Sequence, residues 1–364
     1  MKSKIISLLL LLAVVSFSNE IQIASIKLSA GDYDRQQTPV SVSLDGLNVN
    51  QDVGQLQLIK VSSGNRERIF SQVISGDNSR LYWIVDRIAA NESLTYELVR
   101  TEFQSDEAAI RVEVDEQKLV IQKDGKKLLQ YNSGTVFPPD GVDTIYKRSG
   151  FIHPLWSPAQ NVLTRIQPPD HYHHYGIWGP WTKTHIADRE IDFWNLAKGH
   201  GTVRFAGLMS IIEGAVLSGF KVHQEHIDFG ATGSDKTAMN EVLDVRAWNV
   251  ASGAWMLDYT ITLNCPTDTV MLDAYRYGGG IGFRAVESWT NKNVRVLTSE
   301  GKTRIDADGS MARWCDVSGE NETGQRSGIF FMSHPNNRRH PEPMRIWPEN
   351  ANGGRGDMFF EFCP

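Results

Sequence analysis

Histidines and tryptophans gather in one stretch of the sequence, between Gly150 and Leu196. The histidines are His153, His171, His173, His174 and His185, and the tryptophans are Trp156, Trp178, Trp181 and Trp194. Histidine exchanges protons near neutral pH, and indole rings offer an apolar face against which the C–H groups of a sugar can pack. Prolines and glycines interrupt the stretch too often for a long helix. We therefore expect loops that carry a site for proton transfer or ligand binding.

The densest group is the run from His171 to Tyr175, which reads HYHHY. In extended backbone, residues two apart face the same side, so we expect His171 and His173 to point together and His174 to point away. Such a pair could act as acid and base, grip a polar ligand or share a metal, and packed, hydrogen-bonded histidines are the structural alternative. A metal would need a third ligand, for which the sequence offers His223, Glu225 and His226.

Acid–base chemistry is the use that we favour for this group. His173 is expected to take or deliver the proton, with His171 or Tyr175 as its counterpart. Arg165 would neutralise a sugar carboxylate or a developing enolate.

The expected site residues come from several segments. The candidate catalytic residues are His171, His173, His174, Tyr175, Glu287 and Glu300. The candidate substrate-binding residues are Arg165, Asp170, Trp178, Trp181, Arg284, Arg338, His340 and Arg345. Tryptophans would stack on the sugar ring, and arginines would bind a carboxylate or sulfate in bidentate fashion.

Composition narrows the class of partner. The chain has 364 residues, of which 41% are hydrophobic, and a formal net charge of −6. It shows no basic stripe that would follow a phosphate backbone, so no nucleic-acid partner is expected. Three cysteines (Cys265, Cys315 and Cys363) allow one disulfide at most, which excludes a disulfide-stapled fold, and no CxxC spacing suggests a zinc ribbon.

The first residues have the pattern of a secretory signal peptide. Lys2 and Lys4 precede an apolar run from Ile5 to Phe17, followed by small residues. We predict a signal peptide over residues 1–18 and a secreted or periplasmic protein. No later segment is apolar enough to cross a bilayer, so no membrane contact is expected after cleavage.

Alternating apolar residues predict strands along most of the remaining chain. Examples are Leu94 to Leu98 and Met256 to Leu263, and Asp124-Gly125 marks a hairpin. The spacing predicts an all-β protein, a large antiparallel β-sandwich with long functional loops, as a single domain over residues 19–364. A strand pattern at Asp357 to Phe362 lies so near the last residue that we expect a C-terminal piece to be missing.

Several long runs resemble the PmoA-like family, also described as DUF6807. They read SGFIHPLWSP, VLTRIQPPDHYHHYGIWGPWT, DFWNL, LTSEGKTRIDADGSMARWC and HPEPMRIWPEN. The likeness covers most of the chain and is clearest over residues 131–364. Family chains usually continue past the strand at Phe359–Phe362, in line with a truncated C-terminus.

The resemblance implies an exported bacterial protein of polysaccharide utilisation, with a fold that resembles the galactose-mutarotase-like supersandwich. Relatives of that fold transfer protons on sugars with a histidine and a carboxylate. By analogy, one of His171, His173 and His174 would work with Glu287 or Glu300. The family label names a methane oxygenase, but this chain lacks the several spanning helices of such a subunit.

We therefore expect an enzyme that performs lyase, dehydratase or epimerase chemistry on oligosaccharides, with a glycosidase as a variant. A non-catalytic carbohydrate-binding protein and a metal-dependent oxidase or oxygenase are the alternatives. The expected partner is an oligosaccharide or a glycan that contains uronic acid. No cofactor is predicted, a divalent metal being the alternative, and the oligomeric state stays open.

Overall fold

The computed structural model describes residues 20–47, 49, 55–76, 78–102, 106–230, 235–251, 253–266, 269–274 and 278–364. The predicted signal peptide, residues 1–18, lies outside the described residues. The described residues contain no helix that is both long and apolar enough to cross a membrane.

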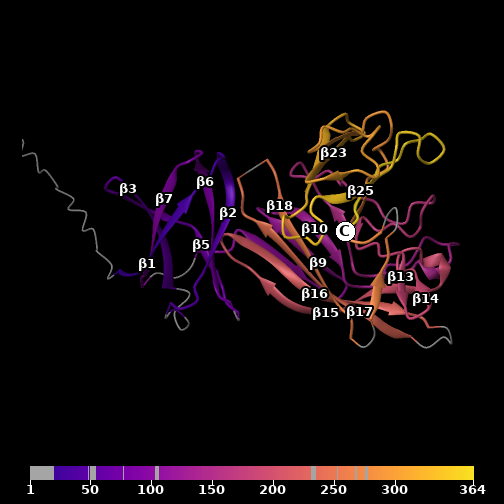
Figure 1. Ribbon diagram of the computed structural model, residues 1–364, viewed down its shortest axis with the longest axis horizontal. Coiled ribbons are helices and arrows are strands. Elements are labelled where there is room, and N and C mark those ends of the chain that lie inside the picture. The colour runs from indigo at the N-terminus through magenta and orange to yellow at the C-terminus, as the bar shows by residue number, and fades with distance from the viewer. Residues whose placement is uncertain are drawn as a thin grey trace, which may run out of the picture. The chain divides into compact units, whose positions relative to one another are not determined.

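The chain separates into two compact units, residues 1–107 and 108–364, where the sequence predicts a single domain. Figure 1 colours the first unit indigo to purple and the second from there to yellow. Each unit has a hydrophobic core of its own, which the regular strand spacing of the sequence does not reveal.

The described residues of the N-terminal unit form two small antiparallel sheets. One has the order β1 (Ile21–Ser29), β7 (Ser93–Arg100), β3 (Leu56–Ser62), β4 (Asn65–Ile69). The other has the order β2 (Arg35–Ser43), β6 (Arg80–Ile88), β5 (Ser71–Ile74). Leu58 and Leu98 from the first sheet share a core with Leu81 and Trp83 from the second.

A nine-stranded antiparallel sheet organises the C-terminal unit. Its order is β22 (Met311–Ala312), β25 (Glu342–Ile346), β26 (Phe359–Phe362), β20 (Ile281–Arg284), β12 (Ile177–Trp178), β11 (Phe151–Leu155), β10 (Lys126–Asn132), β9 (Lys118–Lys123), β8 (Ile110–Val114). The predicted hairpin at Asp124-Gly125 joins β9 to β10, with both residues at positive φ.

The described part of this unit also contains three smaller sheets. The long strands β15 (Gly201–Ile212), β16 (Leu217–Asp228), β17 (Lys236–Trp248) and β18 (Met256–Asn264) form one sheet. The others are β21 (Arg295–Thr298), β23 (Trp314–Glu320), β24 (Arg326–Met332), and β14 (Arg189–Ile191), β13 (Thr184–Ile186), β19 (Val270–Leu272). Two 3-10 helices, η2 (Thr144–Tyr146) and η3 (Leu196–Lys198), lie in connections.

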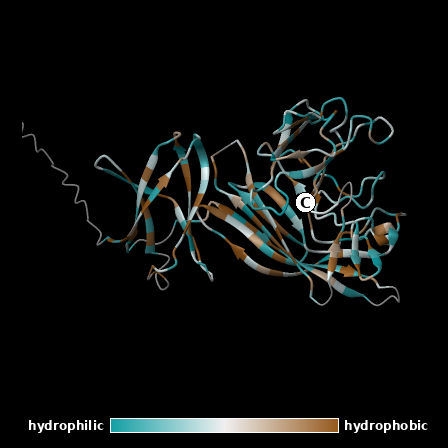
Figure 2. Cartoon of the chain, in the orientation of Figure 1, coloured by the Kyte–Doolittle hydropathy of each residue, from teal (hydrophilic) through white to brown (hydrophobic). Residues whose placement is uncertain are grey.

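The main core lies between the nine-stranded sheet and two of the smaller sheets. Phe283 and Phe360 of the large sheet share it with Phe220 and Leu243 of the four-stranded sheet and with Val317 of β23. Figure 2 shows apolar stretches along the long strands of the four-stranded sheet. Sheets packed face to face confirm the predicted all-β, antiparallel sandwich.

Strand alternation leaves a second face on the nine-stranded sheet. On β26, Phe360 and Phe362 enter the main core, whereas Phe359 joins a separate aromatic cluster with Trp178 and Trp194. Arg284 follows the core residue Phe283 on β20 and faces the same way as Phe359, its cross-strand partner. This second face carries the candidate site.

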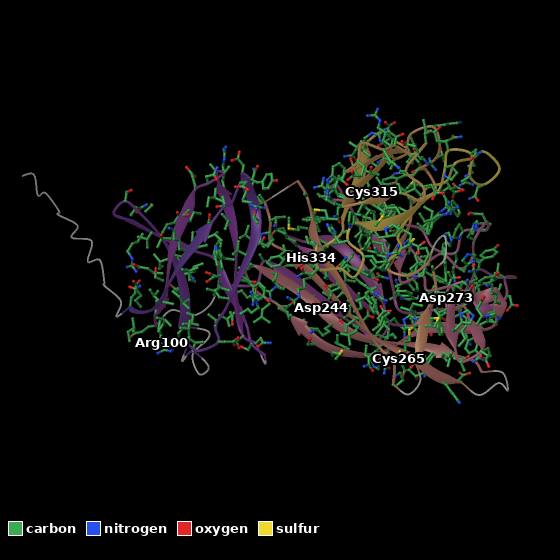
Figure 3. The ribbon with its side chains drawn as sticks, viewed as in Figure 1. Arg100, Asp244, Cys265, Asp273, Cys315 and His334 are labelled. Atoms are coloured by element: carbon green, nitrogen blue, oxygen red, sulfur yellow. The ribbon has the colours of Figure 1, made fainter. Side chains whose placement is uncertain are left out.

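All three cysteines are free thiols. Cys265 and Cys315 lie far apart in the C-terminal unit (Figure 3). The stability of this unit therefore rests on its core and not on cross-links.

Phe360→Ala should reduce the free energy of unfolding of the C-terminal unit by about 3–5 kcal/mol, because Phe360 is fully buried and stacks on Phe331 at 4.5 Å. Urea unfolding followed by tryptophan fluorescence measures this loss. The fluorescence reports mainly on the C-terminal unit, because Trp83 is the one tryptophan of the N-terminal unit. Phe330→Ala is the matched control; Phe330 is 50% exposed, and its loss should cost about 1 kcal/mol or less. Equal losses for the two variants would contradict the assigned core.

Candidate functional site

Sheet order brings two long connections to one edge of the nine-stranded sheet. Strands β12 and β26 both pair antiparallel with β20, so they run in the same direction and begin at the same edge, where β20 ends at Arg284. The connection from β11 to β12 carries the histidines, and the connection from β25 to β26 carries Trp347 to Asp357. Segments that are nearly two hundred residues apart therefore meet beside Arg284.

The histidine segment is a turn, and the predicted alternation is wrong here. The amide of His171 donates to the carbonyl of Pro168 at 2.8 Å, and the amide of His174 donates to that of His171 at 3.0 Å. An isolated bridge between Ile166 and Tyr175 closes the loop. Two successive turns, the first of which begins at Pro168, replace extended backbone, so the side chains of His171 and His174 come together.

The three loop histidines consequently form one cluster. The ring centroid of His171 lies 5.4 Å from that of His173 and 4.8 Å from that of His174. His173 and His174 lie 4.9 Å apart. Tyr172 turns away and packs on Tyr146.

Asp170 and His171 form a hydrogen-bonded pair. Nδ1 of His171 lies 2.8 Å from Oδ2 of Asp170. The same oxygen accepts from Arg284 at 2.7 Å and from the side-chain amide of Asn352 at 2.8 Å. Burial acts to raise the pKa of Asp170, but the bonds to His171 and Asn352 and the charges of Arg284 and Arg165 outweigh it and hold the pKa well below its usual range.

Asp357 is the hub of the ion pairs. Its side chain is 2% exposed, and Oδ1 lies 3.2 Å from Arg165 and 3.0 Å from Arg355. Oδ2 lies 3.5 Å from Arg284 and accepts from Asn352 at 2.6 Å. One carboxylate thus gathers three guanidinium groups from three segments.

Further carboxylates balance this charge. Arg165 lies 3.7 Å from Asp170, and Glu287 pairs with Arg355 at 2.8 Å and with Arg165 at 3.9 Å. The side chain of Glu287 is 72% exposed, which places it at the rim. Three arginines therefore face three carboxylates, and the cluster is close to neutral.

Aromatic rings surround the histidines and the arginine. Trp347 is half-buried, with its ring 4.8 Å from that of His171 and 4.6 Å from the guanidinium carbon of Arg284. Trp178 is fully buried at 5.2 Å from His174, and Trp181 belongs to another buried cluster. Trp178 and Trp181 are therefore closed to a ligand that arrives from solvent, whereas Trp347 is partly exposed.

Burial separates the histidines chemically. It lowers the pKa of His173 to about 4, and His171 contributes to the shift. It lowers the pKa of the fully buried His174 well below the usual value, with further effects of His173 and Arg284. Both imidazoles are therefore neutral near pH 7. Burial also lowers the pKa of Arg284, to about 10, which leaves the guanidinium charged.

Tyr175 lies beneath the loop. Its hydroxyl donates to the carbonyl of Tyr146, and its ring packs on Phe151 at 5.0 Å. Burial raises the pKa of Tyr175 to about 12. The hydroxyl proton is thus engaged by the carbonyl of Tyr146, and no hydrogen bond among the described residues joins this phenol to His173.

Other predicted site residues have different partners. Glu300 accepts from Ser299 and lies 4.0 Å from Arg313, and Nδ1 of His340 lies 3.0 Å from the hydroxyl of Ser333. Arg345 forms an ion pair with Asp308, and Arg338 is exposed. The site predicted from the sequence is therefore too large, because Glu300, His340 and Arg345 have partners outside the histidine cluster.

The candidate metal ligands of β16 also have other partners. His226 is fully buried and lies 2.8 Å from Glu241, His223 lies 2.9 Å from Asn240, and Glu225 pairs with Arg204. Across the described ranges, no group of three or more His, Cys, Asp or Glu side chains is arranged to hold a metal ion.

Three important residues were missed by sequence reasoning: Trp347, Asn352 and Asp357. Asp357 stands directly before a phenylalanine-rich strand, but a lone carboxylate in such a place has no distinguishing pattern. Its role follows from the pairing of β26 with β20, which is not a local property of the sequence.

Residues 118–361 match a family of unknown function, DUF6807. A search of curated proteins gave no match for this chain. The matched range contains every residue of the cluster described above.

Asp357→Asn should reduce the free energy of unfolding of the C-terminal unit by about 3 kcal/mol, because buried guanidinium groups lose their shared counter-charge. Glu287→Gln is the matched control, since its exposed carboxylate pairs with two of the same arginines; its cost should be below about 1 kcal/mol. Urea unfolding followed by tryptophan fluorescence measures both. A similarly small loss of stability for both variants would contradict the role of Asp357 as the shared counter-charge of the arginines.

Acidification should destabilise the C-terminal unit through two histidines that burial keeps neutral. Burial lowers the pKa of His153 and of His173 to about 4, below the value of about 6.5 in an unfolded chain. The unfolded chain therefore binds more protons as the pH falls. Each histidine should remove on the order of 1–2 kcal/mol between about pH 7 and about pH 5.

Urea unfolding at several pH values tests this loss. Asp170 does not contribute in this window, because its lowered pKa matters only below about pH 4. His173→Gln should show a shallower fall of stability than the unaltered protein. An unchanged slope would show that His173 is not held neutral by burial.

Proposed function

The chain belongs to the DUF6807 family, and we propose that it is an exported bacterial enzyme that moves protons on carbohydrate substrates, with His171 as its acid–base group. The reaction class that we favour is lyase, dehydratase or epimerase chemistry. The hydrogen-bonded pair of Asp170 and His171 carries this proposal.

The pair has the parts that general acid–base catalysis needs. Asp170 accepts the proton of Nδ1, which fixes the tautomer and leaves the lone pair of Nε2 available. Among the described residues, none hydrogen-bonds Nε2, and the side chain of His171 is 30% exposed. His173 is half-buried, and its pKa, lowered to about 4, makes it a weak base, so the assignment shifts from His173, favoured by sequence, to its neighbour His171.

The arginines supply electrostatic stabilisation. The side chain of Arg165 is 13% exposed, whereas that of Arg284 is fully buried, so Arg165 is the one that a substrate carboxylate would meet. Proton abstraction next to a carboxylate develops negative charge, which a nearby guanidinium stabilises. The negative charge that develops on the substrate also favours the imidazolium that His171 becomes when it takes the proton.

A sugar fits the remaining surroundings. The half-buried indole of Trp347 lies beside His171 and offers an apolar surface next to polar groups. The resemblance to PmoA-like proteins adds a setting of polysaccharide utilisation, and the predicted signal peptide adds export. Together these favour an oligosaccharide that contains uronic acid.

Turnover of a panel of uronic-acid oligosaccharides, followed by ultraviolet absorbance and NMR of the products, tests the proposal. His171→Gln should lower kcat by about 100-fold or more while oligosaccharide binding persists. His185→Gln is the matched control, because His185 also lies against an aspartate, Asp273, at 2.6 Å outside the cluster. Asp273 is labelled in Figure 3.

Equal activity of His171→Gln and His185→Gln would refute the assigned base. Binding of oligosaccharides by the unaltered protein without any turnover would instead identify a carbohydrate-binding protein.

A further inference from the structure

Asn352 connects the two central carboxylates of the site. Its Nδ2 donates to Oδ2 of Asp170 at 2.8 Å and to Oδ2 of Asp357 at 2.6 Å. Both partners are carboxylate oxygens that accept, so the amide nitrogen is the atom that faces them. The amide therefore places a neutral donor between two negative charges that would otherwise repel each other.

The backbone holds this amide in place. Asn352 has a φ of 51°, in the left-handed region that asparagine tolerates better than most residues. The buried guanidinium of Arg304 donates to the carbonyls of Trp347 at 2.9 Å and Asp357 at 2.8 Å and so fixes both ends of the loop. The amide of Gly356 closes it on the carbonyl of Ala351 at 2.8 Å.

We propose that Asn352 is the positioning residue of the proposed reaction, holding the carboxylate of Asp170 in the orientation that binds Nδ1 of His171. The catalytic meaning of this role rests on the proposed function. The geometry itself is present in the resting protein and is measured without a substrate. Asn352 acts through Asp170 and is not itself a catalytic residue.

The proton affinity of His171 should depend on how Asn352 holds the carboxylate of Asp170. The pair of His171 and Asp170 is surrounded by charged, titratable or aromatic side chains. These are His173, His174, Arg165, Arg284, Trp347 and Asp357. A carboxylate in place of the amide adds negative charge beside Asp170 and favours the imidazolium form. Loss of the amide frees Asp170 to turn toward Arg165, which also changes the field at His171.

The experiment is an NMR titration of histidine-labelled full-length protein, with the signal of His171 assigned by its loss in His171→Gln. Asn352→Asp should raise the titration midpoint of His171 by about one pH unit. Asn352→Gly keeps the left-handed backbone and should shift the midpoint by more than the control does. The control is Asn350→Asp, an exposed asparagine of the same loop, which should leave the midpoint unchanged.

Urea unfolding shows whether each variant is folded, and Asn352→Gly carries the test if Asn352→Asp is not. Midpoints in both Asn352 variants that equal that of Asn350→Asp would overturn the proposal. Absence of turnover in the unaltered protein would sink the proposed function and leave the titration result in place. The two failures are therefore distinguishable.

Discussion

The buried carboxylate of Asp357 is the interaction on which the rest of the site depends. Charges attract strongly where water is excluded, but a buried guanidinium is costly unless a counter-charge is present. Asp357 supplies that counter-charge to Arg165, Arg284 and Arg355, which come from three separate segments. With the guanidinium of Arg284 fixed, the carboxylate of Asp170 is fixed as well, and with it the imidazole of His171.

The nine-stranded sheet makes this convergence possible. Its antiparallel order places the starts of β12 and β26 beside the end of β20, so both long connections emerge next to Arg284. Core residues such as Phe283 and Phe360 anchor the same strands from the opposite face. The core thus determines where the polar groups of the second face stand, and Phe359 with Trp178 forms an apolar base under the histidines.

Much of the fold follows from local patterns, and much of the site does not. Alternation and the Asp124-Gly125 turn correctly indicate antiparallel strands, because side-chain period and turn chemistry are local properties. The orientation of His174 was predicted wrongly because the Pro168-Pro169 turn replaces extended backbone. Asp357 and Asn352 could not be predicted, since their roles depend on which strands are neighbours. The burial of Trp178 has the same non-local origin.

The crystal structure of His171→Gln with a bound uronic-acid oligosaccharide tests the central claim most directly. The account predicts a sugar ring against Trp347, its carboxylate at Arg165 and the carbon that loses its proton facing position 171, with Asp170 still held by Arg284 and Asn352. An oligosaccharide bound elsewhere on the protein, with no contact to Trp347, Arg165 or position 171, would contradict it.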